Sequence, residues 1–192
     1  MKTQSSLKAL FVSRTRQKLI NLFFFLPHNY YYVRQLVRQT GEEINSVRRE
    51  LKNLKDANLL NSEKRSHRLY YYPNPDSPLF VSLLILANQS SLLAQSLRNS
   101  GVDLLLYGFH FAAMAKTDTD LVDLLIVGNI YPKEVENMIK AEEKLRGREI
   151  NYMIMGSEEF RLRKLKRDPI LIEFLLHFPL IIIGDLNRLN HL

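Results

Sequence analysis

The chain has 192 residues, of which 46% are hydrophobic and 24% charged, and it contains no cysteine. The lack of cysteine excludes disulfide bonds, thiolate metal sites and cysteine nucleophiles, and it fits a reducing compartment. No apolar run approaches the ~20 residues of a membrane-spanning helix, and the N-terminus lacks the apolar region of a signal peptide. We therefore expect a cytoplasmic protein without a membrane partner.

The net charge of +7 is unevenly distributed along the chain. Residues 1–77 hold fourteen Lys or Arg against six Asp or Glu, whereas residues 78–192 hold thirteen against fourteen. Clustered positive charge attracts the phosphate backbone of nucleic acids and speeds the encounter with it. The asymmetry indicates that a nucleic-acid-binding function would lie in the N-terminal part.

The first predicted helix begins after Ser13, which can cap it, and ends at Pro27. The tyrosine triplet at 30–32 then favours a short strand. Two short helices around a turn at Gly41 follow, each with an apolar stripe at helical spacing. The second begins near Ile44, and its other face carries the polar and basic residues Asn45, Ser46, Arg48, Arg49 and Lys52. Such a face suits a helix that enters the major groove of DNA, although a solvated helical hairpin would show the same pattern.

A basic hairpin is predicted over residues 61–72, with Lys64, Arg65, His67 and Arg68 at or near its tip. Residues 11–75 resemble the winged helix-turn-helix domains of ArsR- and MarR-like transcription regulators. The segment YYVRQLVRQTGEEINSVRRELKNLKDANLL and the return strand at 68–72 carry the resemblance. It implies that the helix near Ile44 is a recognition helix, that the hairpin is the wing, and that double-stranded DNA is the partner of a homodimer.

Prolines at 73, 75 and 78 mark a boundary after the hairpin. A single helix is predicted from residue 77 to about 99, with a broad apolar stripe that could join two domains or pair with its copy in a dimer. We therefore expect a DNA-binding domain at 1–76, a connecting or dimerisation helix at 77–100, and a second domain at 101–192.

The second half alternates predicted strands and helices, so the fold class is α+β with a mixed sheet in the second domain. Strands are expected at 102–107, 121–127, 150–155 and 180–183. Pro132 opens a helix whose inward residues should be Val135, Met138, Ile139 and Leu145. Further helices should start at Ser157, as a cap, and at Asp168.

The segment from Leu104 to Gly128 resembles the core of small nucleotidyltransferase-fold domains. The family has a Gly-Ser pair that grips the triphosphate and an Asp-x-Asp pair that holds Mg²⁺. Here Gly108 keeps the glycine, Phe109 replaces the serine, and Asp123 matches the second Asp. The first Asp position is Leu121, and Asn151 stands where a third carboxylate is expected.

The resemblance therefore implies a degenerate, non-catalytic domain with a vestigial nucleotide site and neither metal nor cofactor. Asp118 and Asp120 lie just upstream and could replace the missing ligand, so an active Mg²⁺-dependent nucleotidyltransferase targeted by its winged helix is an alternative. An antitoxin-like partner of another protein is a further one. The first reading is a transcriptional regulator whose second domain dimerises or senses a nucleotide or other small-molecule effector.

Overall fold

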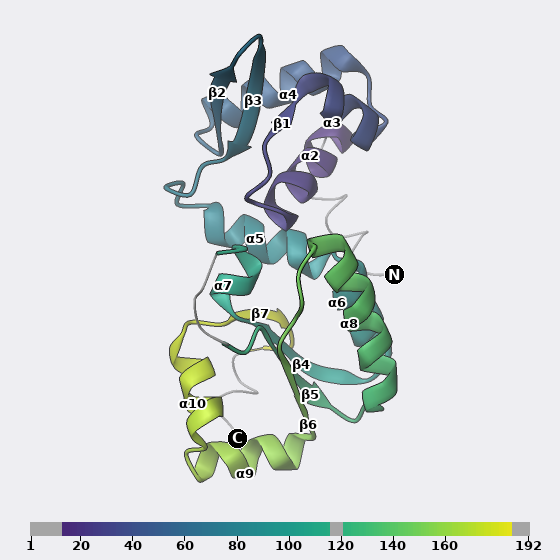
Figure 1. Ribbon diagram of the computed structural model, residues 1–192, viewed down its shortest axis with the longest axis vertical. Coiled ribbons are helices and arrows are strands. Elements are labelled where there is room, and N and C mark those ends of the chain that lie inside the picture. The colour runs from purple at the N-terminus through teal and green to yellow at the C-terminus, as the bar shows by residue number, and fades with distance from the viewer. Residues whose placement is uncertain (1–12, 116–120, 186–192) are drawn as a thin grey trace. The chain divides into compact units, whose positions relative to one another are not determined.

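The chain divides between Ser90 and Ser91 into two units, residues 1–90 and 91–192, each with its own sheet (Figure 1). The computed structural model describes residues 13–115 and 121–185. The fold class is α+β, as the sequence predicts. Unit 1 contains, in chain order, α2 (Arg14–Phe25), β1 (Tyr31–Tyr32), α3 (Val33–Thr40), α4 (Ile44–Asp56), β2 (Leu60–Arg65), β3 (Arg68–Pro73) and α5 (Phe80–Gln89).

Local signals explain why the helices of unit 1 begin and end where they do. The Ser13 hydroxyl accepts the backbone N–H of Arg16 at 3.2 Å, so the predicted cap of α2 is confirmed. Gly41 has φ +65° at the end of α3 and donates its N–H to the Val37 carbonyl at 2.9 Å. This left-handed conformation costs glycine little because it lacks a Cβ, and it turns the chain into α4.

The hairpin of unit 1 is part of a three-stranded antiparallel sheet with the order β1-β3-β2. Tyr31 lies opposite Tyr71, and Tyr32 lies opposite Tyr70, so the predicted tyrosine strand pairs with the return strand of the hairpin. At the base of the hairpin, the side-chain amide of Asn74 donates to the Asn58 carbonyl at 3.1 Å and accepts from Asn61 at 3.2 Å. These amide contacts fix the start of β2 to the end of β3. We refer to residues 60–73 as the basic hairpin.

The prediction of one continuous helix over residues 77–99 is wrong. The structure has α5, which ends at Gln89 in unit 1, and α6 (Leu92–Asn99), which belongs to unit 2. Ser91 is extended (φ −63°, ψ 157°), and its hydroxyl accepts the N–H of Ala94 at 3.1 Å as the cap of a new helix. Serine favours caps over helix interiors because its hydroxyl competes for backbone groups.

Unit 2 has a four-stranded mixed sheet with the order β6-β5-β4-β7, in which only the β5–β6 pair is parallel. Its elements after α6 are β4 (Val102–Tyr107), α7 (Phe109–Ala112), β5 (Leu124–Gly128), α8 (Pro132–Arg146), β6 (Tyr152–Met155), α9 (Ser157–Leu165), α10 (Pro169–Leu176) and β7 (Leu180–Ile183). The four predicted strands are therefore present, with β5 and β6 starting two or three residues later than expected.

Helices cover both faces of this sheet. Phe160 of α9 and Leu171 and Phe174 of α10 pack against Leu104, Leu106, Leu125 and Val127 on one face. Alternation along β4 points Tyr107 to the other face, where its ring contacts Phe111 edge-on at 5.1 Å between centroids. Helices α6 and α8 pack together. Helix α8 lies on the Tyr107 side of the sheet, because its residues Glu142 and Arg146 are close enough to influence the pKa of the Tyr107 hydroxyl electrostatically.

Two details of unit 2 differ from expectation. Leu145, predicted to point inward, is 53% exposed, and the ion pair of Glu142 and Arg146 is buried in its place. The Arg146 guanidinium lies 4.3 Å from the Phe111 ring centroid, and this stack offsets part of the cost of burying the charge. Ser157 lies inside α9, and the cap is Gly156 without a side-chain hydrogen bond.

The described ranges contain no single helix with both the length and the apolar character that would be needed to span a membrane.

Candidate functional site

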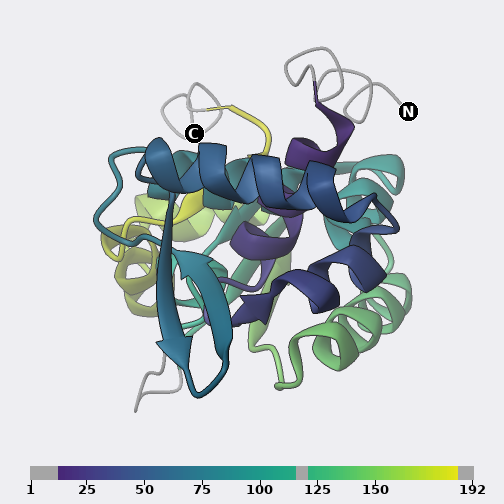
Figure 2. The ribbon, with the colours of Figure 1, turned by 90° about the horizontal axis from the view of Figure 1, so that it is seen from above.

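A groove of about 800 Å³ lies in unit 1 between α3, the start of α4 and the basic hairpin. In Figure 2 the basic hairpin and α3 lie on the same side of α4. The lining of the groove combines apolar and cationic side chains and includes no acidic residue. Its lining residues are Tyr32, Val33, Arg34, Val37, Arg38, Ile44, Arg48, His67, Arg68 and Leu69.

Among the described residues, the groove arginines form no ion pair. Within the described part of the chain, no carboxylate lies within 4 Å of the guanidinium groups of Arg34, Arg38, Arg48 or Arg68. All four side chains are exposed. Four cationic groups around one recess attract a polyanion more strongly than the same charges spread over the surface.

The nine residues predicted to bind DNA occupy three places around this groove. Arg48, His67 and Arg68 line it. Asn45 and Ser46 lie in the first turn of α4, while Arg49 and Lys52 are exposed further along that helix. Lys64 and Arg65 are exposed on the hairpin, outside the groove lining. Sequence reasoning missed Arg34 and Arg38, whose signal was their i, i+4 spacing on the polar face of α3.

Glu43 caps the N-terminus of α4. Its carboxylate accepts the backbone N–H groups of Asn45 at 2.8 Å and Ser46 at 2.9 Å, and these hydrogen bonds lower the pKa of Glu43. A carboxylate in this place satisfies the end of the helix and complements its dipole. The side chains of Asn45 and Arg48 remain exposed beside the cap.

Helix α2 anchors the turn between α3 and α4. Lys18 donates to the Thr40 carbonyl at 2.6 Å and to Glu42 at 2.5 Å, and the hydrogen bond from Lys18 lowers the pKa of Glu42. Arg16 donates to the buried carboxylate of Glu50 at 2.8 Å, which ties the middle of α4 to α2. The groove is therefore built on helices whose relative positions are fixed by charge-assisted bonds.

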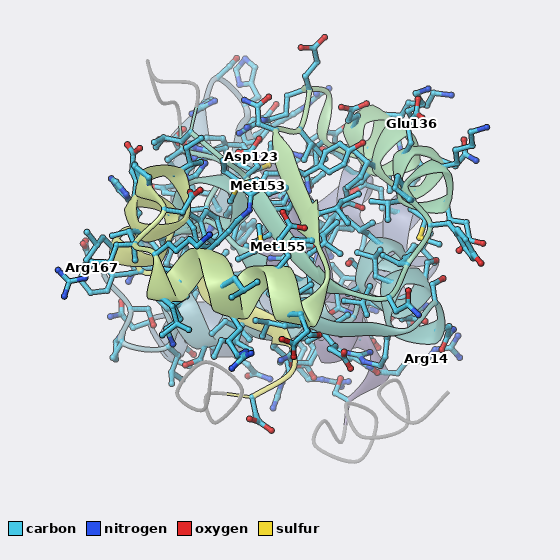
Figure 3. All side chains as sticks on the ribbon, turned by 90° about the horizontal axis from the view of Figure 1, so that it is seen from below. Arg14, Asp123, Glu136, Met153, Met155 and Arg167 are labelled. Atoms are coloured by element: carbon cyan, nitrogen blue, oxygen red, sulfur yellow. The ribbon has the colours of Figure 1, made fainter. Side chains whose placement is uncertain are left out.

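In unit 2 Asp123 lies directly before β5 and is fully buried; Figure 3 labels it. Arg148 donates through Nη2 to both carboxylate oxygens at 2.6 Å. His110 Nε2 lies 2.9 Å from Oδ1, and the backbone N–H of Asn151 donates to Oδ2 at 3.0 Å. Each carboxylate oxygen therefore has two partners, which uses the roughly four acceptor positions of the group.

This arrangement does not fit a Mg²⁺ site. A cation at Asp123 would have to displace the Arg148 guanidinium, which already supplies a positive charge to the carboxylate. Asn151 contributes its backbone, while its side-chain amide donates to the Leu121 carbonyl at 3.5 Å. Within residues 13–115 and 121–185, no three His, Asp or Glu side chains gather as metal ligands. Asp118 and Asp120 lie outside the described residues.

The glycine and the phenylalanine of the predicted vestigial site take different roles. Gly108 is buried, and a Cβ there would lie 2.5 Å from the His110 ring, so the absence of a side chain makes room for the histidine. Phe109 is 38% exposed at the start of α7. Sequence reasoning missed His110 and Arg148 as partners of Asp123, because residues 13 and 25 positions away leave no periodic signal.

In comparisons with known proteins, no family model, curated protein or solved structure matches the chain.

Proposed function

We propose that the protein is a cytoplasmic transcriptional regulator that binds double-stranded DNA through unit 1, a winged helix-turn-helix. The observation that supports it most directly is the groove with four unneutralised arginines, lined jointly by α3, α4 and the hairpin. The charge partition of the chain supports it independently, because the basic excess lies within residues 1–77.

In this proposal α4 enters the major groove with its first two turns. Asn45, Arg48 and Arg49 are exposed there and carry the amide and guanidinium groups that pair with adenine and guanine edges. Arg34, Arg38 and Arg68 on the groove rim, with Lys64 on the hairpin, take phosphates of the backbone and set the orientation of the domain. Base contacts then specify the sequence, and phosphate contacts supply most of the affinity.

The experiment that tests the DNA-binding proposal is a fluorescence-polarisation titration of a mixed duplex library at several salt concentrations. Replacing Arg34, Arg38 and Arg48 together with Ala should weaken binding about 100-fold or more at low salt and reduce the salt slope by about 0.9 per lost phosphate contact. The matched control replaces Lys133, Lys140 and Lys144 of α8 with Ala, an equal loss of charge from unit 2. Equal effects of the two triple variants would contradict the proposal.

Sequence reading is tested by Arg48→Ala. Losing a bidentate contact to a base should cost about 1–3 kcal/mol on the preferred duplex and relax the preference at one position. Lys64→Ala should instead weaken all duplexes alike. Selection from a random library, followed by titration of the best sites, separates these two outcomes. An Arg48→Ala variant with an unchanged sequence preference would show that Arg48 makes no base-specific contact.

We propose that unit 2 is a nucleotidyltransferase-like domain that transfers no nucleotide and serves in dimerisation or in sensing a nucleotide or other small molecule. The saturated carboxylate of Asp123 supports this, since no acceptor position is left for a metal ion. Incubation with each labelled nucleoside triphosphate, Mg²⁺ or Mn²⁺ and protein or RNA acceptors tests it. Incorporation above background that requires the divalent ion would overturn it, whereas triphosphate binding without incorporation would identify the effector class.

We also propose a homodimer, since two half-sites multiply the contacts of a winged helix. Apolar side chains are exposed on the segment predicted to mediate the contact: Leu79 (52%), Val81 (40%) and Leu92 (71%). Light scattering should return twice the chain mass of 22.5 kDa at micromolar concentration. The monomer mass across that range would rule the dimer out.

A further inference from the structure

Four tyrosines share one face of the three-stranded sheet in unit 1. Tyr32 lies opposite Tyr70, and their ring centroids are 5.7 Å apart. Tyr30, directly before β1, packs on Tyr72 of β3 with ring centroids 4.7 Å apart. Since side chains alternate along strands, Tyr31 and Tyr71 point to the opposite face. We refer to Tyr30, Tyr32, Tyr70 and Tyr72 as the tyrosine face.

Two hairpin arginines lie against this face. The guanidinium carbon of Arg65 is 4.0 Å from the Tyr30 centroid and 5.8 Å from that of Tyr70. That of Arg68, directly opposite Arg65 across the hairpin, is 4.8 Å from the Tyr32 centroid. A guanidinium stacked on a ring uses its flat side, so the N–H groups along its edge can still donate to an anion.

Tyr32 also contacts an arginine from the helix opposite the hairpin. Its hydroxyl accepts from Arg38 Nη2 of α3 at 3.2 Å, while its ring carries Arg68. Arg38 and Arg68 both line the groove. One tyrosine therefore holds cationic groups on two sides of the same recess. Arg65 receives a second restraint, because its Nε also pairs with the carboxylate of Glu63.

We propose that the tyrosine face presets Arg38, Arg65 and Arg68 as a clamp for neighbouring phosphates of one DNA strand, with Tyr30 and Tyr32 as positioning residues. This inference rests on the proposed DNA-binding function and deepens it by naming the part of the DNA that the hairpin takes. A long arginine side chain loses much rotamer freedom when it is fixed on a ligand. Arginines already held on tyrosines lose less, so they bind phosphate more tightly than unsupported ones.

The test is a pair of double-mutant cycles measured by duplex binding. Tyr32→Leu removes the ring and should weaken binding about three- to tenfold, the range of a cation–π contact together with one ordered side chain. In an Arg68→Ala background most of that loss should disappear. Tyr32→Phe keeps the ring and removes the hydroxyl, so it should weaken binding about two- to threefold. That loss should disappear in an Arg38→Ala background.

Salt dependence separates positioning from direct contact. Arg68→Ala should lower the salt slope by about 0.9, because one phosphate contact is lost. Tyr32→Leu should leave the slope nearly unchanged while affinity falls, since the arginine still reaches its phosphate from a less ordered state. Lys64 is the matched control: it is the hairpin neighbour of Arg65, lies opposite Leu69 and belongs to the other face of the sheet. Tyr30→Leu should couple to Arg65→Ala and act additively with Lys64→Ala.

Urea unfolding of each variant checks that the sheet still forms, and Tyr131→Leu in unit 2 controls for loss of an exposed tyrosine. If Tyr32→Phe is as stable as the wild-type protein, the double-mutant cycle of Tyr32→Phe with Arg38→Ala remains interpretable even if Tyr32→Leu unfolds. Additive cycles with both arginines would overturn the inference and leave the DNA-binding proposal intact. If Arg38→Ala and Arg68→Ala both bound duplex DNA as tightly as the wild-type protein, neither residue would belong to the DNA-binding surface. The clamp would then be ruled out as well.

Discussion

The two units treat their charged side chains in opposite ways. In unit 1 the arginines of the groove remain exposed. The carboxylates of Glu42 and Glu50 pair instead with Lys18 and Arg16 of α2, and these pairs hold α2, the α3–α4 turn and α4 together. In unit 2 the most buried charges are satisfied within the unit, with Asp123 held by Arg148 and Glu142 held by Arg146. An unneutralised cation is available for an external anion, whereas a saturated pair contributes to internal order. This difference is the structural basis for our proposal that unit 1 binds DNA.

The sharpest way to break this comparison is to remove Asp123. Asp123→Ala would leave His110 and Arg148 without their shared anion, and because Arg148 is partly exposed, the loss should be about 1–3 kcal/mol. Hydrogen–deuterium exchange should show faster exchange across unit 2 and unchanged exchange in unit 1. Glu136→Ala, which removes one partner of an exposed pair on α8, should change little. A stable Asp123→Ala variant would mean that the carboxylate has a role other than structural order.

Each unit ends one helix on a left-handed glycine, which gives a matched pair of mutations. Gly41 (φ +65°) follows α3 and Gly147 (φ +69°) follows α8, and a Cβ at either position meets nothing within 4 Å. Alanine at each should cost about 1 kcal/mol from backbone strain alone. Urea unfolding followed by hydrogen exchange should localise each loss to its own unit. Only Gly41→Ala should also weaken duplex binding, because the strained turn leads directly into α4.

Acid should destabilise unit 1 by a smaller amount. Hydrogen bonds from Lys18 lower the pKa of Glu42, and those from the backbone N–H groups of Asn45 and Ser46 lower the pKa of Glu43, from an ordinary value of 4.5. A lowered pKa in the folded state stabilises above the unfolded pKa, and this stability is lost as pH falls through the folded pKa. Unit 1 should therefore lose stability below about pH 4.5.

Circular dichroism and hydrogen exchange over this pH range measure the effect. Glu43→Gln should flatten the acid dependence of unit 1, because the glutamine stays neutral throughout. Glu149→Gln, a change at an exposed residue of unit 2, is the control. An unchanged acid profile in Glu43→Gln would show that the cap contributes no pH-dependent stability.

Much of the fold follows from local sequence signals. Ser13, Gly41, Pro132 and Asp168 mark element boundaries because each has a specific backbone or capping preference, and the structure confirms all four. The break at Ser91 was missed because an apolar stripe on both sides masked a capping serine. Leu145 was predicted to be buried because apolar periodicity favours a leucine over an arginine for an inward position. In the structure Arg146 takes that position, where its guanidinium stacks on Phe111.

The sites follow from the sequence less completely. The exposed faces of α4 and the hairpin could be predicted from charge and spacing, but the contribution of Arg34 and Arg38 depends on how α3 packs beside the hairpin. The partners of Asp123 depend on strand register and on a loop after α8. Such contacts between distant residues are fixed by tertiary structure, so one sequence alone does not determine them.

The sheet of unit 1 also gives the protein an intrinsic optical probe. The chain has nine tyrosines and no tryptophan, and six of the nine lie at positions 30–32 and 70–72. Ultraviolet emission and near-ultraviolet circular dichroism of the unlabelled chain therefore report mainly on this one sheet. An anion that binds an arginine stacked on one of these rings should change the signal, so binding kinetics become measurable without a dye.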